Sequence, residues 1–203
     1  VTGWKNVLLE NAITPIQQYS YTQGKNSTDS AMIIDAMDIL YENRLDGFCI
    51  VSSDSDFTRL ATRLRESGKR VIGIGEQKTP NPFIVACDKF IFLEILSPES
   101  CKINKKKFVD KHSNNHRSTK TLKLPEDVIE LITISADDVA DDEGWAFLGE
   151  VGNLILKKRP SFDPRNYGYS KLTPLIAATD LFDIDMRETS NKGVKHMYIR
   201  IKE

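Results

Sequence analysis

The sequence predicts an α/β domain with a mostly parallel sheet, followed by a small α+β domain. Three observations lead to this prediction. Residues 1–97 alternate helical and apolar extended segments, a pattern typical of parallel sheets covered by helices. Residues 122–203 place three helical segments before two extended runs. Residues 98–121 carry seven Lys or Arg residues against two acidic ones and few aliphatic residues, which predicts a basic flexible linker.

The elements of the first domain, residues 1–97, follow from the spacing of apolar side chains. Helical spacing predicts helices at 4–8, 31–41 and 57–64, and a helical turn at 82–87; Gly68 is expected to end the third helix. Short apolar runs predict strands at 16–21, 48–52, 71–74 and 90–95.

The second domain, residues 122–203, has a different order of elements. Helices are expected at 128–139, 145–158 and 171–179, and strands at 181–186 and 194–201 on either side of a turn at 190–193. Three helices followed by a β-hairpin form the winged-helix arrangement. The side chains assigned to its core are Trp145, Phe147, Leu148, Leu172, Leu175 and Ile176.

Composition and hydropathy indicate a soluble protein. No apolar run approaches the roughly 18 residues that a membrane-spanning helix needs. The first residues also lack the basic-then-apolar order of a signal peptide. The expected compartment is therefore the cytoplasm.

Two aspartates, Asp54 and Asp56, directly follow the apolar strand expected at 48–52. Open parallel sheets bind their ligands beyond the carboxyl ends of the strands, so acids at this place are candidates for function. The alternative is helix capping, because Ser and Asp are favoured N-cap residues and acids suit the first helical turn.

A third aspartate, Asp29, begins the apolar stripe of the helix expected at 31–41. An inward carboxylate needs a partner or a cation, although Asp29 could instead cap its helix or pair with Lys25. Three carboxylates at one sheet edge would suit Mg²⁺ or Mn²⁺, which can activate water for attack on a phosphodiester. We therefore predict that Asp29, Asp54 and Asp56 are metal-binding and catalytic residues.

The first domain resembles a known family in the stretches GKNSTDSAMIIDAMDIL and DGFCIVSSDSDFTRLATRLRESGKRVIGIG. These stretches resemble the NYN domains, PIN-like ribonuclease relatives that include the LabA-like bacterial proteins. The resemblance covers about residues 1–96 and implies a Rossmann-like sheet, dependence on Mg²⁺ or Mn²⁺, and phosphodiester hydrolysis. Asp29, Asp54 and Asp56 match metal-binding acids of the family, and Asp88 matches a recurrent position with a structural or catalytic role.

One feature departs from the family pattern. NYN domains begin with a strand that ends in a further metal-binding aspartate, and this chain starts beyond that point, so its domain is expected to lack the first strand. Two functions remain open on this ground. One is a metal-dependent endoribonuclease, and the alternative is a non-catalytic RNA-binding or regulatory adaptor with an inactive NYN fold.

The second domain resembles the OST-HTH, or LOTUS, domains in GWAFLGEVGNLILKKRPSFDPRNYGYSKLTPLIAATDLFDID and GVKHMYIRIK. This resemblance implies RNA binding or, in some relatives, docking of a protein partner; winged helices can also bind duplex DNA. Cations interleaved with aromatic side chains can contact phosphates and stack on unpaired bases. The same lysines could instead complement a helix dipole, and the tyrosines could belong to the core. The expected RNA-binding residues are Lys158, Arg159, Arg165, Tyr167, Tyr169, Lys171 and Lys195.

Overall fold

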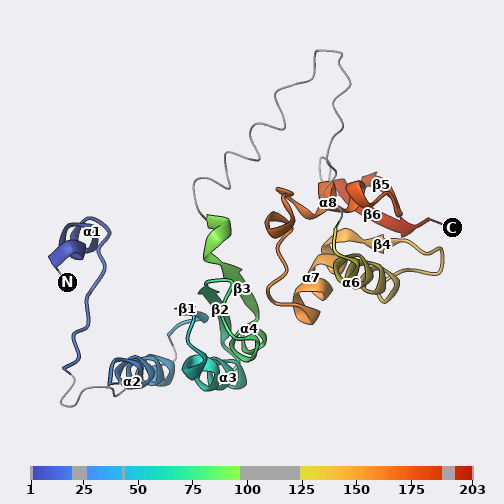
Figure 1. Cartoon of the computed structure of the whole chain (residues 1–203). Coiled ribbons are helices and arrows are strands. Elements are labelled where there is room, and N and C mark those ends of the chain that lie inside the picture. The colour runs from blue at the N-terminus through green and yellow to red at the C-terminus, as the bar shows by residue number, and fades with distance from the viewer. Residues whose placement is uncertain (1, 20–26, 43, 97–123, 189–194, 203) are drawn as a thin grey trace, which may run out of the picture. The chain divides into compact units, whose positions relative to one another are not determined.

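The computed structural model describes residues 2–19, 27–42, 44–96, 124–188 and 195–202 (Figure 1). The chain divides into two compact units, Val1–Leu45 and Asp46–Glu203. Among the helices described, none combines the length and apolar character that crossing a membrane requires.

The first unit is helical. It contains the 3-10 helix η1 (Thr2–Trp4), α1 (Lys5–Glu10) and α2 (Ser27–Glu42), so the two helices predicted here are confirmed. The strand predicted at 16–21 is wrong for residues 16–19, which form no strand, while residues 20 and 21 lie outside the described part. Ile16 is 71% exposed, and an apolar run without a hydrogen-bonded neighbour does not make a stable strand.

The second unit begins with a parallel sheet, as predicted. Its strands are β1 (Gly47–Val51), β2 (Arg70–Gly75) and β3 (Lys89–Phe92), in the order β1-β2-β3 with both pairs parallel. Strand β3 is shorter than the predicted 90–95, because the chain turns into the 3-10 helix η3 (Leu93–Leu96). The crossovers are η2 (Ser55–Phe57) with α3 (Thr58–Glu66), and α4 (Asn81–Ala86).

The apolar spacing of α3 explains how it packs. Leu60, Ala61 and Leu64 share one face and are buried, and the left-handed Gly68 (φ 76°) follows the end of the helix, as expected. The ring of Phe90 meets that of Phe83 edge to face with centroids 5.9 Å apart. This core holds the sheet and its helices together, and thereby fixes the strand ends.

The rest of the unit is a small α+β domain. Its helices are α6 (Glu126–Asp137), α7 (Leu148–Lys158), the 3-10 helix η4 (Pro164–Tyr167) and α8 (Leu172–Thr179). The strands β4 (Ala146–Phe147), β5 (Phe182–Glu188) and β6 (Lys195–Ile201) form an antiparallel sheet in the order β4-β6-β5. The turn predicted at 190–193 lies outside the described residues.

Two predictions about residues 145–158 are wrong. Ala146 and Phe147 form strand β4 instead of starting the helix, because they pair with Ile199 and Tyr198 of β6. Trp145 and Phe147 also lie outside the apolar core: two arginine side chains stack on the Trp145 ring, and Phe147 stacks on His196 with centroids 4.8 Å apart. Leu175 and Ile176 are buried in the core as predicted, and Leu148 and Leu172 pack against it.

Candidate functional site

The candidate site is built on the carboxyl ends of β1 and β2. The backbone N–H of Ser52 donates a hydrogen bond to the Ile74 carbonyl at 2.9 Å, which continues the ladder beyond β1. The N–H of Glu76 donates to the Ser53 hydroxyl, also at 2.9 Å. These two hydrogen bonds attach the loop, which contains Asp54 and Asp56, to strand β2 and the residue that follows it.

Asp54 caps the short helix η2. Its Oδ1 accepts a hydrogen bond from the Asp56 N–H at 2.9 Å, and its own N–H donates to the Ser52 hydroxyl at 3.1 Å. The capping interpretation therefore holds for one oxygen of Asp54. The same bonds orient a carboxylate that stays exposed at the edge of the sheet.

Asp56 lies in the first turn of η2 and is also exposed. A carboxylate at this place is favoured by the partial positive charge of the helix N-terminus. Asp54 and Asp56 thus form an acidic pair beyond β1, at the edge where open parallel sheets bind ligands.

Asp29 lies in the first turn of α2 and is half-buried. It belongs to the other compact unit, so its membership in one site with Asp54 and Asp56 stays a prediction. Lys25, its alternative partner, lies outside the described residues.

Asp88 has a structural role. Arg65 Nε donates to its Oδ1 at 2.9 Å, and the N–H of Val71 donates to its Oδ2 at 2.8 Å. Both oxygens are therefore engaged in joining α3, the start of β2 and the start of β3.

Most basic residues predicted to bind RNA have acidic neighbours. Lys158 pairs with Asp138 at 2.6 Å, and Arg159 pairs with Asp127 at 2.9 Å. Lys195 lies 3.6 Å from Glu188 across the β5–β6 pair. Such exposed pairs are weak, so each cation can exchange its partner for a phosphate at small cost.

The remaining predicted RNA-binding residues surround η4 and the start of α8. Lys171 is the exposed N-cap of α8, whereas Tyr167 and Tyr169 pack against the domain core. Arg165 donates from Nε and Nη2 to the two oxygens of Asp163, at 2.9 and 2.7 Å. Both tyrosines thus contact the core while staying partly exposed, and their RNA-binding role stays a prediction.

Asp163 is a buried carboxylate held by this arginine. Burial alone would raise the pKa of Asp163, but the hydrogen bonds from the Arg165 side chain and backbone outweigh burial, so the pKa lies below its usual value. Its deprotonated form is therefore part of the folded structure.

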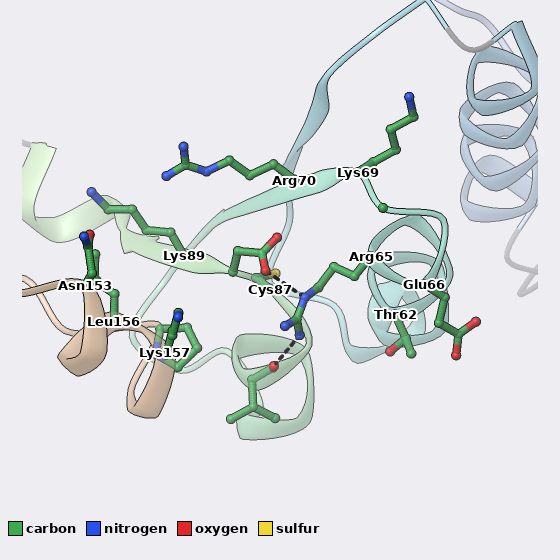
Figure 2. A pocket seen from close by; sticks show the side chains of 14 residues that line it. Thr62, Arg65, Glu66, Lys69, Arg70, Cys87, Lys89, Asn153, Leu156 and Lys157 are labelled. Atoms are coloured by element: carbon green, nitrogen blue, oxygen red, sulfur yellow. Dashed lines mark hydrogen bonds and ion pairs between the residues drawn. The ribbon is translucent and has the colours of Figure 1, made fainter. Parts of the chain in front are cut away.

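Sequence reasoning did not find a cavity of about 930 Å³ at the amino ends of β2 and β3. Figure 2 shows Arg65, Lys69, Arg70 and Lys89 around it, together with residues of α7 such as Lys157. The apolar spacing within each helix or strand could not indicate this site, because its residues come from three separated stretches of the chain, 62–70, 85–89 and 153–160. The only available hint was the high number of basic residues at the ends of these elements.

Two family models match the two parts of this architecture. The NYN domain family matches residues 1–94, and the OST-HTH/LOTUS domain family matches residues 120–194. A solution NMR structure of an uncharacterized protein from Nitrosomonas europaea is 34% identical, with the match covering 46% of this chain and 91% of that one, at a TM-score of 0.36. None of the curated proteins gives a significant match. The chain is thus an NYN-domain protein in which an OST-HTH/LOTUS domain follows the NYN domain.

Proposed function

We propose that this protein is a cytoplasmic, metal-dependent endoribonuclease whose LOTUS domain binds RNA. The observation that carries the proposal is the acidic pair Asp54 and Asp56, exposed beyond β1 at the ligand-binding edge of an NYN sheet. The LOTUS domain supplies the expectation of RNA as the substrate.

We further propose that Asp29 completes the site. Each of the three aspartates, Asp29, Asp54 and Asp56, can offer a carboxylate oxygen to a metal ion. The donor set fits, because carboxylate oxygens are the ligands that Mg²⁺ and Mn²⁺ prefer. When bound, such an ion would neutralise phosphate charge and activate water for in-line attack.

The chain's own residues have separate tasks in this proposal. The bond from the Asp56 N–H fixes the orientation of the Asp54 carboxylate before any ligand binds. The basic and aromatic side chains predicted in the LOTUS domain hold the RNA by phosphate contacts and stacking. They are Lys158, Arg159, Arg165, Tyr167, Tyr169, Lys171 and Lys195.

The test is cleavage of a fluorescent single-stranded RNA with Mg²⁺ or Mn²⁺, together with calorimetric titration of each metal. We expect EDTA-sensitive cleavage, a saturable metal site, and loss of at least about 100-fold in rate for Asp54→Asn. The matched control is Asp38→Asn, which changes an exposed aspartate of α2 and should leave the rate unchanged.

The opposite results would identify the alternative function, a non-catalytic RNA-binding adaptor. Cleavage that persists in Asp54→Asn or in EDTA would come from another site or a contaminant. RNA binding without a saturable metal site and without cleavage would overturn the nuclease proposal.

A further inference from the structure

We infer that the cavity at the amino ends of β2 and β3 binds the phosphodiester backbone of an RNA strand. This inference rests on the proposed function and adds to it a second contact region for the substrate. We call the cavity the amino-edge groove; its lining includes Lys69, Arg70, Lys89 and Lys157.

The groove combines residues of both domains within the unit Asp46–Glu203. Arg70 is the first residue of β2, Lys89 is the first residue of β3, and Lys157 lies in the last turn of α7. The Phe90 N–H donates to the Pro160 carbonyl at 2.8 Å, which joins β3 to the chain beyond α7. Figure 2 shows the basic side chains of the two domains around the same space.

The groove carries an excess of positive charge. Five of its lining residues are basic and two, Glu66 and Asp88, are acidic. Asp88 is paired with Arg65, and Glu66 lies 3.8 Å from both Arg59 and Arg63. Both acids are therefore already neutralised by arginines.

Two of the cations have no acidic partner among the residues that the structure describes. Arg70 and Lys157 are exposed and form no ion pair there. Because Arg70 and Lys157 belong to different domains, a polyanion long enough to contact both would be attracted electrostatically by both side chains. They are the best-placed residues for a test.

The lining favours phosphate over bases. None of the lining residues is aromatic, so a base has no ring to stack on in the groove, whereas Lys and Arg are the usual contacts of the phosphate backbone. Burial raises the pKa of the Cys87 thiol to about 11, so this part of the wall is uncharged. Such a groove would hold RNA without reading its sequence.

The groove lies at the opposite edge of the parallel sheet from Asp54 and Asp56. Strand β2 has six residues, and at about 3.3 Å each the two edges are roughly 20 Å apart. A substrate must be long enough to pass from one edge to the other to use both. The groove therefore makes cleavage depend on RNA length.

The experiment measures binding of a fluorescein-labelled 20-nucleotide RNA to the full chain by anisotropy, over a series of salt concentrations. Each phosphate contact to single-stranded RNA contributes about 0.7 to the slope of log K against log salt. For the double variant Arg70→Ala, Lys157→Ala we expect about tenfold weaker binding in low salt and a slope reduced by about 1.4. Arg70→Lys, which keeps the charge, should bind as the wild type does.

The matched control removes two exposed cations that do not line the groove, one from each domain: Lys5→Ala with Lys202→Ala. An unchanged slope in the groove variant, or equal losses in groove and control variants, would overturn the inference. Displacement of the RNA by polyglutamate at equal charge concentration would also overturn it, in favour of an acidic peptide.

Failure of the groove and failure of the proposed function give different results. Asp54→Asn should abolish cleavage and leave anisotropy binding unchanged. In the cleavage assay, the groove variant should process the 20-nucleotide RNA more slowly and a trinucleotide at the wild-type rate, because the short substrate cannot span both edges. Equal slowing of both substrates would contradict the groove.

Discussion

The two edges of the parallel sheet differ in charge and in how their carboxylates are used. At the carboxyl edge, Asp54 and Asp56 are exposed, and Asp54 caps η2 through one oxygen. At the amino edge Arg70 and Lys89 begin the strands, and the one aspartate of the groove, Asp88, uses both oxygens in hydrogen bonds. The contrast shows two uses of an aspartate at a strand end: both oxygens of Asp88 hold the fold together, whereas Asp54 caps a helix through Oδ1 and stays exposed.

The largest expected effect comes from truncating a core side chain that holds the strands, and thus both ends of the sheet, in place. Phe90 is 1% exposed and packs against Phe83 and Phe92. We expect Phe90→Ala to lower the free energy of unfolding by about 3–5 kcal/mol, through lost burial and the cavity that remains. Urea unfolding followed by circular dichroism measures it. A loss under about 1 kcal/mol would show that the edges do not depend on this core.

An intermediate effect on the free energy of unfolding distinguishes Asp88, whose two oxygens are both hydrogen-bonded, from Asp54, which caps η2. In Asp88→Asn one oxygen is replaced by an amide NH₂, which faces either Arg65 or the Val71 N–H as a second donor, so we expect a loss of about 1–3 kcal/mol in unfolding free energy. In Asp54→Asn the remaining amide oxygen can still accept from the Asp56 N–H, and we expect less than about 0.5 kcal/mol. Equal losses in urea unfolding would remove the distinction between the edges.

The smallest effect concerns Asp163, whose carboxylate also interacts electrostatically with Lys89 at the amino edge. Because its pKa is lower in the folded state than the ordinary value of about 3.9, its stabilisation is fully present above that value. It is lost as the pH falls through the folded pKa. Between pH 7 and pH 3, wild type should therefore lose more unfolding free energy than Asp163→Asn does. The same loss in both proteins would contradict the assignment.

The sequence predicted the parallel sheet well, because its signal is local. The apolar runs at β1 and β2 and the helical stripe of α3 are decided by side chains a few residues apart. It could also place Asp54 and Asp56 at a strand end, since they follow β1 directly.

The failures have a common physical cause, which is dependence on distant partners. A strand was predicted for residues 16–19 and a helix for Ala146–Phe147, and both predictions were wrong. Strand formation depends on hydrogen bonds to segments far away in the sequence, which local composition does not show. Trp145 was also expected in the core. Its contacts with Arg187 and Arg200 are made by strands β5 and β6, more than forty residues later.

The hydrogen bond between Phe90 and Pro160 has a consequence for self-association. β3 is an outer strand of its sheet, and the unpaired backbone groups of outer strands can recruit a strand from a second molecule and start aggregation. The Phe90 N–H is occupied by the Pro160 carbonyl, and proline has no N–H with which to extend a ladder. The contact thus leaves one N–H of β3 unavailable for pairing with a strand of a second molecule, without adding a strand to the sheet. Through Pro160, the LOTUS domain therefore protects the sheet of the NYN domain against aggregation.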